Sequence, residues 1–321
     1  MRYADAHADL FFEVAFNECD IFKEQNTLHF TYQGMLKAKQ RLQVCSLWTP
    51  PKYKGQEARE FCDQMLDALD GTVAAHPDKL RKVQSGEELR SLGANDSAPI
   101  GLVPWIEGAS PLMGDIAVFH EYADRGVKGI GLTWNHANEV ADGCGVKEPR
   151  RGLTDFGHCL VEEMEARRVL VDAAHLPEPA FWDVMAMAKR PVVITHCGLR
   201  WRVPITRNPS AVMAKAVADS GGFVGIDFYP GHIVNHTDAP LGRKADLNDL
   251  VATITDAINV CGVDNVVLGG DFDGFRDPIV GLTGVWDIPN LEQAMLDSGL
   301  ASSSVEKVMG RNLIERLVAL W

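Results

Sequence analysis

Short apolar runs recur along the chain, and most are followed by a segment with the periodicity of an amphipathic helix. Eight of these runs are rich in β-forming residues and span residues 2–7, 41–48, 99–107, 127–134, 168–175, 191–197, 222–229 and 265–272. Several are almost continuous in apolar and small residues, which is typical of parallel strands covered on both faces. The pattern therefore predicts eight buried parallel strands.

Helix-like segments lie between these runs, at residues 56–76, 115–126, 154–168, 179–190, 208–222 and 247–262. Thr154 and Asn208 occupy N-cap positions, and Gly126 and Gly221 follow the last turn, where a left-handed residue ends a helix. Repeated strand–helix alternation predicts an α/β fold, a (β/α)8 TIM barrel, rather than an open doubly wound sheet. The motifs GxGxxG and GxxxxGK[ST] are absent, so a nucleotide-binding fold is not indicated.

The chain has 321 residues, a length compatible with two domains or with one large barrel. No linker, repeat or low-complexity tract divides it, so we expect a single barrel domain over residues 1–321. Two long polar segments, residues 17–30 and 230–247, follow the first and the seventh predicted strands. Long loops on a barrel usually carry function, so we expect these two to shape a substrate pocket.

The composition excludes several classes of partner. Lysine and arginine total 31 against 44 acids, which gives a net charge of −13 and disfavours nucleic acid and anionic membranes. No apolar run reaches the roughly 18 residues of a membrane helix, and the N-terminus lacks the pattern of a secretory signal. The seven cysteines are odd in number and widely spaced, so we expect reduced thiols and a cytoplasmic protein.

The downstream ends of the predicted strands carry residue types that bind metals, and barrel active sites are built at this face. A histidine or an acid ends the first, third, fifth, sixth and eighth strands: His7 with Asp9, Glu107, His175, His196 and Asp271. Alternate residues of a strand point to the same side, so His7 and Asp9 can reach one ion. Each residue alone has an ordinary structural explanation, but five such strand ends together predict a metal site.

The number of candidate ligands suggests how many ions the site holds. His7, Asp9, Glu107, His175 and His196 give five side chains, one more than a closed tetrahedral site needs. Such a set suits two ions that share a bridging carboxylate and a bridging water. Mixed imidazole and carboxylate ligands favour Zn²⁺, although the same set can hold Mn²⁺, Fe²⁺ or Co²⁺.

Eight segments together resemble the renal or membrane dipeptidases, peptidase family M19 of the amidohydrolase superfamily, which are binuclear zinc (β/α)8-barrel enzymes. They are DAHADL, PWIEGAS, GIGLTWNHANEVADG, RGLTDFGHCLVEEME, LVDAAH, VITHC, TRNPS and LGGDFDG, in the family's order. GLTDFG followed by a strand ending in histidine, together with GGDFDG, is specific to this family. The resemblance covers nearly the whole chain and implies an amidohydrolase-like barrel.

The resemblance also implies roles for individual residues. It implies a ligand set of His7 and Asp9 for one zinc ion, His175 and His196 for the other, and Glu107 as the bridge. It implies further that Asp271 shuttles a proton for a metal-bridging hydroxide and that Arg207 grips the terminal carboxylate of the substrate. A homodimer is common in the family.

One position departs from the family pattern. Members often have a histidine where this chain has Trp134, and that histidine is thought to polarise the scissile carbonyl. Here the segment LTWNHAN places His136 two residues later, so either His136 takes this role at the substrate or the role is vacant. The departure leaves the metal ligands intact and bears on the rate and range of dipeptide turnover.

The expected function is hydrolysis of the amide bond of small dipeptides, including L-Xaa-D-Xaa dipeptides, by attack of a metal-bridged hydroxide. Two alternatives stay open. One is hydrolysis of another small N-acyl amino acid or a cyclic amide, which Trp134 keeps under consideration. The other is a non-catalytic metal-binding barrel that senses or sequesters a small ligand, although a pure binder has no need of Asp271.

Overall fold

The computed structural model describes residues 1–23, 28–94, 98–148, 150–235 and 243–321. Within these residues the strands form two all-parallel sheets. One sheet contains β1 (Tyr3–Ala8), β2 (Gln40–Trp48), β4 (Ile100–Glu107), β5 (Gly129–Gly131) and β6 (Leu170–Asp172) in that order, with β3 (Leu80–Lys82) beside β4. The other contains β7 (Ile194–Cys197), β8 (Val224–Ile226) and β9 (Val266–Leu268).

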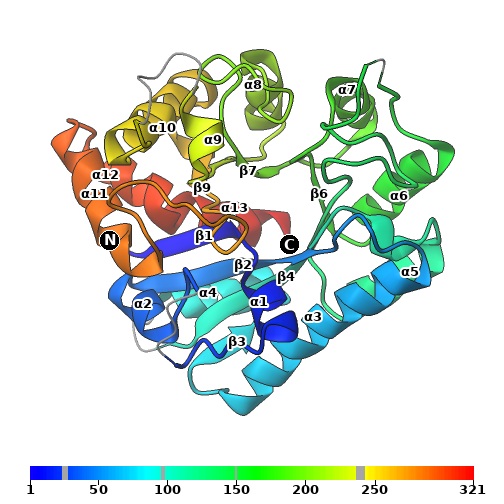
Figure 1. The fold of residues 1–321 in the computed structure, drawn as a ribbon, viewed down its shortest axis with the longest axis horizontal. Coiled ribbons are helices and arrows are strands. Elements are labelled where there is room, and N and C mark those ends of the chain that lie inside the picture. The colour runs from blue at the N-terminus through cyan, green and yellow to red at the C-terminus, as the bar shows by residue number, and fades with distance from the viewer. Residues whose placement is uncertain (24–27, 95–97, 149, 236–242) are drawn as a thin grey trace.

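Two isolated parallel bridges join these sheets. One links Asp172 at the end of β6 to Val193 just before β7, and the other links Ala8 at the end of β1 to Phe272 after β9. The eight strands other than β3 thereby follow one another around a common axis, and each corresponds to one of the predicted runs (Figure 1). The predicted (β/α)8 barrel is confirmed, and β3 is an additional short strand.

Most helices lie around the outside of the strands, whereas the C-terminal helix lies behind them in this view (Figure 1). The helices are α1 (Leu10–Phe16), α2 (Tyr32–Lys37), α3 (Gln56–Ala75), α4 (Gly86–Ala94), α5 (Ile116–Asp124), α6 (Asp155–Ala166), α7 (Glu178–Met187), α8 (Ala211–Asp219), α9 (Pro230–Ile233), α10 (Leu247–Cys261), α11 (Ile288–Asp297), α12 (Ser302–Glu306) and α13 (Asn312–Leu320). The six predicted helical segments correspond to α3, α5, α6, α7, α8 and α10. Among the described residues, no helix combines the length and the apolar character needed to cross a bilayer.

Of two capping residues that the sequence predicts at helix N-termini, one is observed and one is not. Thr154 caps α6 as predicted, because its hydroxyl accepts a hydrogen bond from the Gly157 amide at 3.0 Å. The prediction for Asn208 is wrong, since α8 is capped by Ser210. The fully buried Asn208 side chain instead accepts from the Gly198 amide at 3.1 Å and fixes the segment after β7.

Five of the later strands are shorter than the apolar runs that predicted them, and two buried aspartates account for part of this. Asp172 accepts hydrogen bonds from the amides of Ala174 at 2.9 Å and Thr195 at 3.1 Å, beside the bridge that follows β6. Asp5 accepts from the amides of His7 at 3.0 Å and Gly270 at 2.8 Å, beside the other bridge. Carboxylates thus bind amides that ladder pairing would otherwise use.

A second, smaller apolar core lies where α4 and α13 pack against the barrel strands. It contains Trp105 and Val103 of β4, and the C-terminal helix α13 adds Leu313 and Leu317 to it. The Trp105 indole is fully buried and donates to Asp172 at 3.0 Å. The opposite end of the barrel is left for polar side chains.

The predicted loops 17–30 and 230–247 lie partly outside the described residues, at 24–27 and 236–242, and the second begins with α9.

The packing of Trp105 predicts a contrast between two glycine substitutions. In Gly129→Ala the new methyl would lie 2.1 Å from Trp105 Cζ2, and we expect a loss of about 1–3 kcal/mol in the free energy of unfolding. Gly71 lies within α3 with nothing near its Cβ position, so Gly71→Ala should stabilise the protein by about 0.5–1 kcal/mol. Urea unfolding followed by circular dichroism measures both, and equal effects would contradict this account of the packing.

Candidate metal centre and active site

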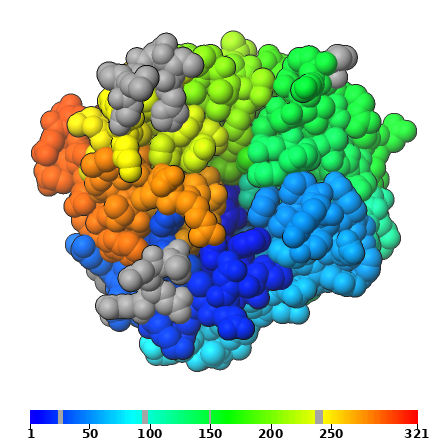
Figure 2. All heavy atoms as spheres, viewed as in Figure 1, coloured from blue at the N-terminus to red at the C-terminus, as the bar shows by residue number. Residues whose placement is uncertain are grey.

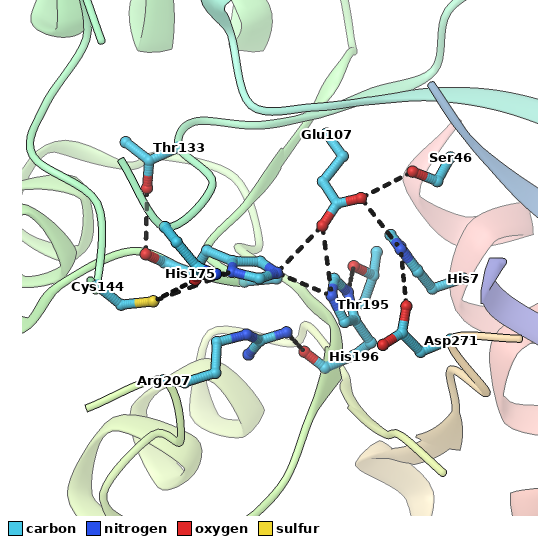
Figure 3. Close-up of polar contacts among 12 residues, drawn as sticks. His7, Ser46, Glu107, Thr133, Cys144, His175, Thr195, His196, Arg207 and Asp271 are labelled. Carbon is cyan, nitrogen blue, oxygen red and sulfur yellow. Dashed lines mark hydrogen bonds and ion pairs between the residues drawn. The ribbon is translucent and has the colours of Figure 1, made fainter. Parts of the chain in front are cut away.

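Glu107, the last residue of β4, stands at the centre of the buried polar cluster (Figure 3). Its Oε2 lies 3.3 Å from His7 Nε2, while its Oε1 lies 3.1 Å from His175 Nε2 and 3.6 Å from His196 Nε2. Ser46 of β2 also donates to Oε2 at 2.8 Å. The two oxygens of one carboxylate therefore face histidines from three other strand ends.

A second group of ligand atoms surrounds His7 on the other side of Glu107. His7 Nε2 lies 3.8 Å from Asp9 Oδ2 and 3.7 Å from Asp271 Oδ1. Asp9 is not part of β1 but the N-cap residue of α1, and its side chain makes no capping hydrogen bond. The Asp9 carboxylate is therefore left to face the cavity rather than the helix.

Unusual backbone conformations help to place three of these side chains. His175, Asp271 and Asp273 have φ angles of +62°, +56° and +67°, in the left-handed region that residues other than glycine seldom adopt. The Asp271 amide donates to the His7 carbonyl at 3.0 Å, which brings the segment after β9 against β1. Such conformations cost free energy and cluster at functional sites.

Further hydrogen bonds orient the imidazole rings. Asn135 Oδ1 lies 2.9 Å from His175 Nδ1, and Thr195 Oγ1 lies 3.1 Å from His196 Nδ1. Thr195 Oγ1 in turn donates to Asp172 Oδ2 at 2.6 Å. In both rings the Nδ1 atom is engaged, so the Nε2 atoms remain directed toward Glu107.

Burial shifts the acid–base properties of these groups strongly. Desolvation lowers the pKa of His175 to about 3 and that of His196 well below its ordinary value. Burial raises the pKa of Asp9 to about 7 and that of Asp271 well above its usual range. Two imidazoles are thus neutral and ready to bind a cation, while two carboxyls hold protons more tightly than usual.

His7 and Glu107 behave differently because they attract each other. Burial lowers the pKa of His7, but the charge of Glu107, with Asp9 and Asp271, outweighs it and raises that pKa to about 10. Burial would raise the pKa of Glu107, but the charge of His7 and the adjacent His175 bring it well below its ordinary value. A proton on His7 therefore balances the buried carboxylate in the absence of another cation.

The donor set fits divalent cations. Among the described residues, two overlapping groups have ligand atoms close enough to share an ion: His7 with Glu107 and His196, and His7 with Asp9 and Asp271. Both ring nitrogens of His7 and Oδ1 of Asp9 are buried without a hydrogen-bond partner. Buried polar atoms are costly without a partner, and a cation bound between His7 Nε2 and Asp9 would satisfy one ring nitrogen and the carboxylate oxygen.

A cavity of about 520 Å³ opens onto this cluster, and its size suits a small ligand. Figure 2 shows this face with the blue N-terminal segment beside the orange segment that follows β9.

Arg207 lines the cavity with a largely buried guanidinium. One nitrogen, Nη2, donates to the His196 carbonyl at 2.9 Å, whereas Nε and Nη1 are buried without a partner. Two unpaired donors at a cavity wall favour an anionic ligand.

Trp134 and His136 lie in different positions relative to the cavity. Trp134 lines the cavity and packs against Trp48 with ring centroids 5.1 Å apart. His136 is exposed, stacks on Trp134 at 5.4 Å and is not among the described residues that line the cavity. The neighbouring side chain, Asn135, turns toward His175 instead. The role of His136 at the substrate stays a prediction.

Sequence reasoning missed several residues that line the cavity. His232 of α9 is one, and its Nδ1 lies 2.7 Å from Oδ2 of the fully buried Asp227. Glu13 of α1 and Asp273 are two more. His232 lies in the predicted loop 230–247, so the loop was recognised but not its histidine. Asp273 was visible in GGDFDG, while Glu13 carried no signal because it lies inside an apolar helix.

The fold and the ligand cluster define the class: a (β/α)8-barrel hydrolase whose mouth can hold divalent metal ions. The family model for membrane dipeptidases, peptidase family M19, matches residues 1–318, and the chain belongs to this family. The sequence-based expectation of a metal-dependent enzyme of this dipeptidase family is thereby confirmed.

Two relatives share similarity with about four fifths of this chain. The chain is 30% identical over 263 residues to an uncharacterized protein from the pqqA 5′ region of Klebsiella pneumoniae, covering 80% of this chain and 95% of that protein. It is 29% identical over 255 residues to dipeptidase aclJ of Aspergillus oryzae, covering 79% of this chain but 60% of that protein.

Two solved structures share the fold. The dipeptidase AC, a metallo peptidase of family M19, superposes with a TM-score of 0.92 at 22% identity, covering 100% of this chain and 99% of that one. A metallo peptidase from Rhodobacter sphaeroides, crystallised with a phosphinate mimic of L-Ala-D-Ala, gives 0.90 at 21% identity with the same coverage.

The protonation states predict how metal binding depends on pH. An incoming divalent ion must displace protons from His7, with a pKa of about 10, and from Asp9, with a pKa of about 7. Affinity should therefore rise with pH between about 5 and 8, with release of about one to two protons at pH 7. Titration calorimetry in buffers of different ionisation enthalpy measures this release. Asp9→Asn should release fewer protons, and a pH-independent affinity would contradict the proposed ligands.

Proposed function

We propose that this protein hydrolyses the amide bond of small dipeptides, including L-Xaa-D-Xaa dipeptides, at a centre of two Zn²⁺ ions. The observation that carries the proposal is the position of Glu107, whose Oε2 faces His7 while its Oε1 faces His175 and His196. A buried carboxylate with histidines at both oxygens is suited to bridge two cations.

The ligands divide between the two ions as follows. We assign His7 and Asp9 to one ion, His175 and His196 to the other, and Glu107 to both. Mixed imidazole and carboxylate ligands support zinc. Ions bound here would supply Lewis acidity, which polarises the amide carbonyl and lowers the pKa of a water molecule.

Asp271 is the proposed general base and acid. Its Oδ1 lies 3.7 Å from His7 Nε2, beside the proposed ligands, and it lines the cavity. Burial raises its pKa well above the usual range, with Asp9 and Asp227 adding to the effect and His7 opposing it. A carboxylate with raised basicity is suited to take a proton from the attacking water and give it to the leaving amine.

Arg207 is the proposed site for the terminal carboxylate of the substrate. Its unpaired Nε and Nη1 are buried at the cavity wall, and a guanidinium binds a carboxylate through charge-assisted hydrogen bonds. The Nη2 bond to the His196 carbonyl holds the side chain next to a proposed zinc ligand. A substrate gripped there has its neighbouring amide near the metal centre.

Hydrolysis of small N-acyl amino acids is the second candidate function. Trp48 and Trp134 form an apolar stretch of the cavity wall that suits an acyl chain, and such substrates also carry a carboxylate for Arg207. The two candidates differ in one chemical group, the free amino terminus.

We also propose a cytoplasmic location. Cys45, Cys62, Cys144, Cys197 and Cys261 are buried thiols outside any disulfide, which supports a reducing environment. The homodimer expected from the family stays a prediction.

Asp271→Asn tests the general base. We expect kcat for L-Ala-D-Ala to fall by about 10²- to 10⁴-fold, because an amide side chain cannot accept the proton. Elemental analysis should find the metal content unchanged. Asp277→Asn is the matched control, because Asp277 is exposed nearby and does not line the cavity. Full activity in the Asp271 variant would refute the assignment.

Arg207→Ala tests the carboxylate site. We expect KM for free-acid dipeptides to rise about 10- to 100-fold, since a charge-assisted ion pair is lost. Dipeptides amidated at the C-terminus should be hydrolysed equally by the wild type and the variant. Arg202→Ala serves as the control, because Arg202 pairs with Asp256 at 2.6 Å. Equal loss on amidated and free-acid substrates would contradict the assigned role.

A further inference from the structure

Two acidic side chains that the mechanism does not use line the cavity near Asp9. Glu13 lies on α1 and is 7% exposed, and Asp273 follows β9 with a side chain that is 2% exposed. Both residues line the same cavity as Asp9, and the Cβ position of Gly274, the residue after Asp273, lies 2.5 Å from Asp9 Oδ2. We call Glu13 and Asp273 the acidic wall.

The contacts of Asp273 leave one carboxylate oxygen unsatisfied. Oδ1 accepts a hydrogen bond from the His29 amide at 2.6 Å, whereas Oδ2 is buried without a partner. The Asp273 amide donates to His29 Nδ1 at 3.0 Å, so this ring nitrogen is an acceptor and the imidazole is neutral. Burial, with Arg276, lowers the pKa of His29 to about 4. His29 therefore does not balance the charge of Asp273.

Glu13 also lacks a cationic partner. Its Oε2 accepts from the neutral Asn17 side chain at 2.7 Å. In the part of the chain that the structure describes, no lysine or arginine nitrogen forms an ion pair with Glu13 or Asp273. Arg276 is exposed where it lines the cavity and lies beyond ion-pair distance. Buried carboxylates without a cationic partner favour a ligand that supplies a positive charge.

The cavity is polarised along its length. Arg207 lies on the side of His175 and His196, where its charge contributes to lowering both imidazole pKa values. Figure 3 shows His7 and Asp271 on the other side of Glu107 from Arg207. The acidic wall adjoins Asp9, on the His7 side. A ligand that spans the metal centre therefore meets a cation at one end and carboxylates at the other.

We propose that Glu13 and Asp273 bind the α-ammonium group of the substrate. This inference rests on the proposed amide hydrolysis and adds to it the two residues that distinguish dipeptides with a free amino terminus from N-acyl amino acids. Glu13 and Asp273 are specificity-determining residues, which accept hydrogen bonds from the ammonium group while Arg207 holds the carboxylate. The distance between the two ends then selects a dipeptide.

The kinetic test compares two substrates that differ only in the amino group, L-Ala-D-Ala and N-propionyl-D-alanine. The wild type should prefer L-Ala-D-Ala in kcat/KM by about 30-fold or more, because without the ammonium the buried carboxylates stay unpaired. Glu13→Gln, which keeps an acceptor for Asn17, should reduce this preference about tenfold or more, mainly through KM. Glu18→Gln is the matched control, because Glu18 is exposed and outside the cavity; its preference should equal that of the wild type.

A binding test separates this inference from the proposed function. Calorimetry on the metal-loaded protein compares the phosphinate mimic of L-Ala-D-Ala with its counterpart that lacks the amino group. Glu13→Gln should weaken binding of the amino compound about tenfold or more and change the other less than about threefold. Asp273→Asn provides a second variant with the same expected pattern, should Glu13→Gln fail to fold.

The outcomes point to different conclusions. Equal wild-type affinity for the two phosphinates, or equal weakening of both by Glu13→Gln, overturns the ammonium site. Wild-type hydrolysis of N-propionyl-D-alanine as fast as L-Ala-D-Ala overturns it too, while amide hydrolysis stands. If neither substrate is hydrolysed, the proposed function fails, and the difference in phosphinate affinity still decides whether the acidic wall binds an ammonium group.

Discussion

Burial of the Glu107 carboxylate among three histidines is the constraint on which this site depends. An ionised carboxylate inside a barrel needs compensating partners, and each of its oxygens faces imidazole groups that come from different strand ends. The first sheet supplies Glu107 and His7, while β7 of the second sheet supplies His196. The site therefore exists only when both sheets are correctly joined.

Two buried aspartates maintain that arrangement. Asp5 and Asp172 lie where the sheets meet through isolated bridges, and each ties backbone amides of two neighbouring strand ends together. Asp172 also anchors Thr195, which contacts His196. Side-chain carboxylates replace ladder hydrogen bonds at these joints, so the strands can shorten and turn their ends toward the cavity. The stability of the barrel and the geometry of the site thus share the same residues.

The sequence pattern predicted much of the fold and of the polar cluster. Eight apolar runs predicted the eight strands of the barrel, and polar residues at their downstream ends predicted the cluster around Glu107, because parallel strands bring these ends to one face. The sequence pattern did not predict the role of a residue whose position depends on contacts with distant segments. Asn208 occupies a position typical of a helix cap, but its side chain holds the segment after β7.

By itself, the sequence determined the barrel class, the metal-ligand residue types at the strand ends and the family to which the chain belongs. Only the tertiary structure decided which further side chains face the cavity. Glu13 lies within an apolar helix and His232 within a polar loop, and neither has a local pattern that marks it. Local periodicity reports which residues are buried, whereas a binding site is formed by segments that only the closed barrel brings together.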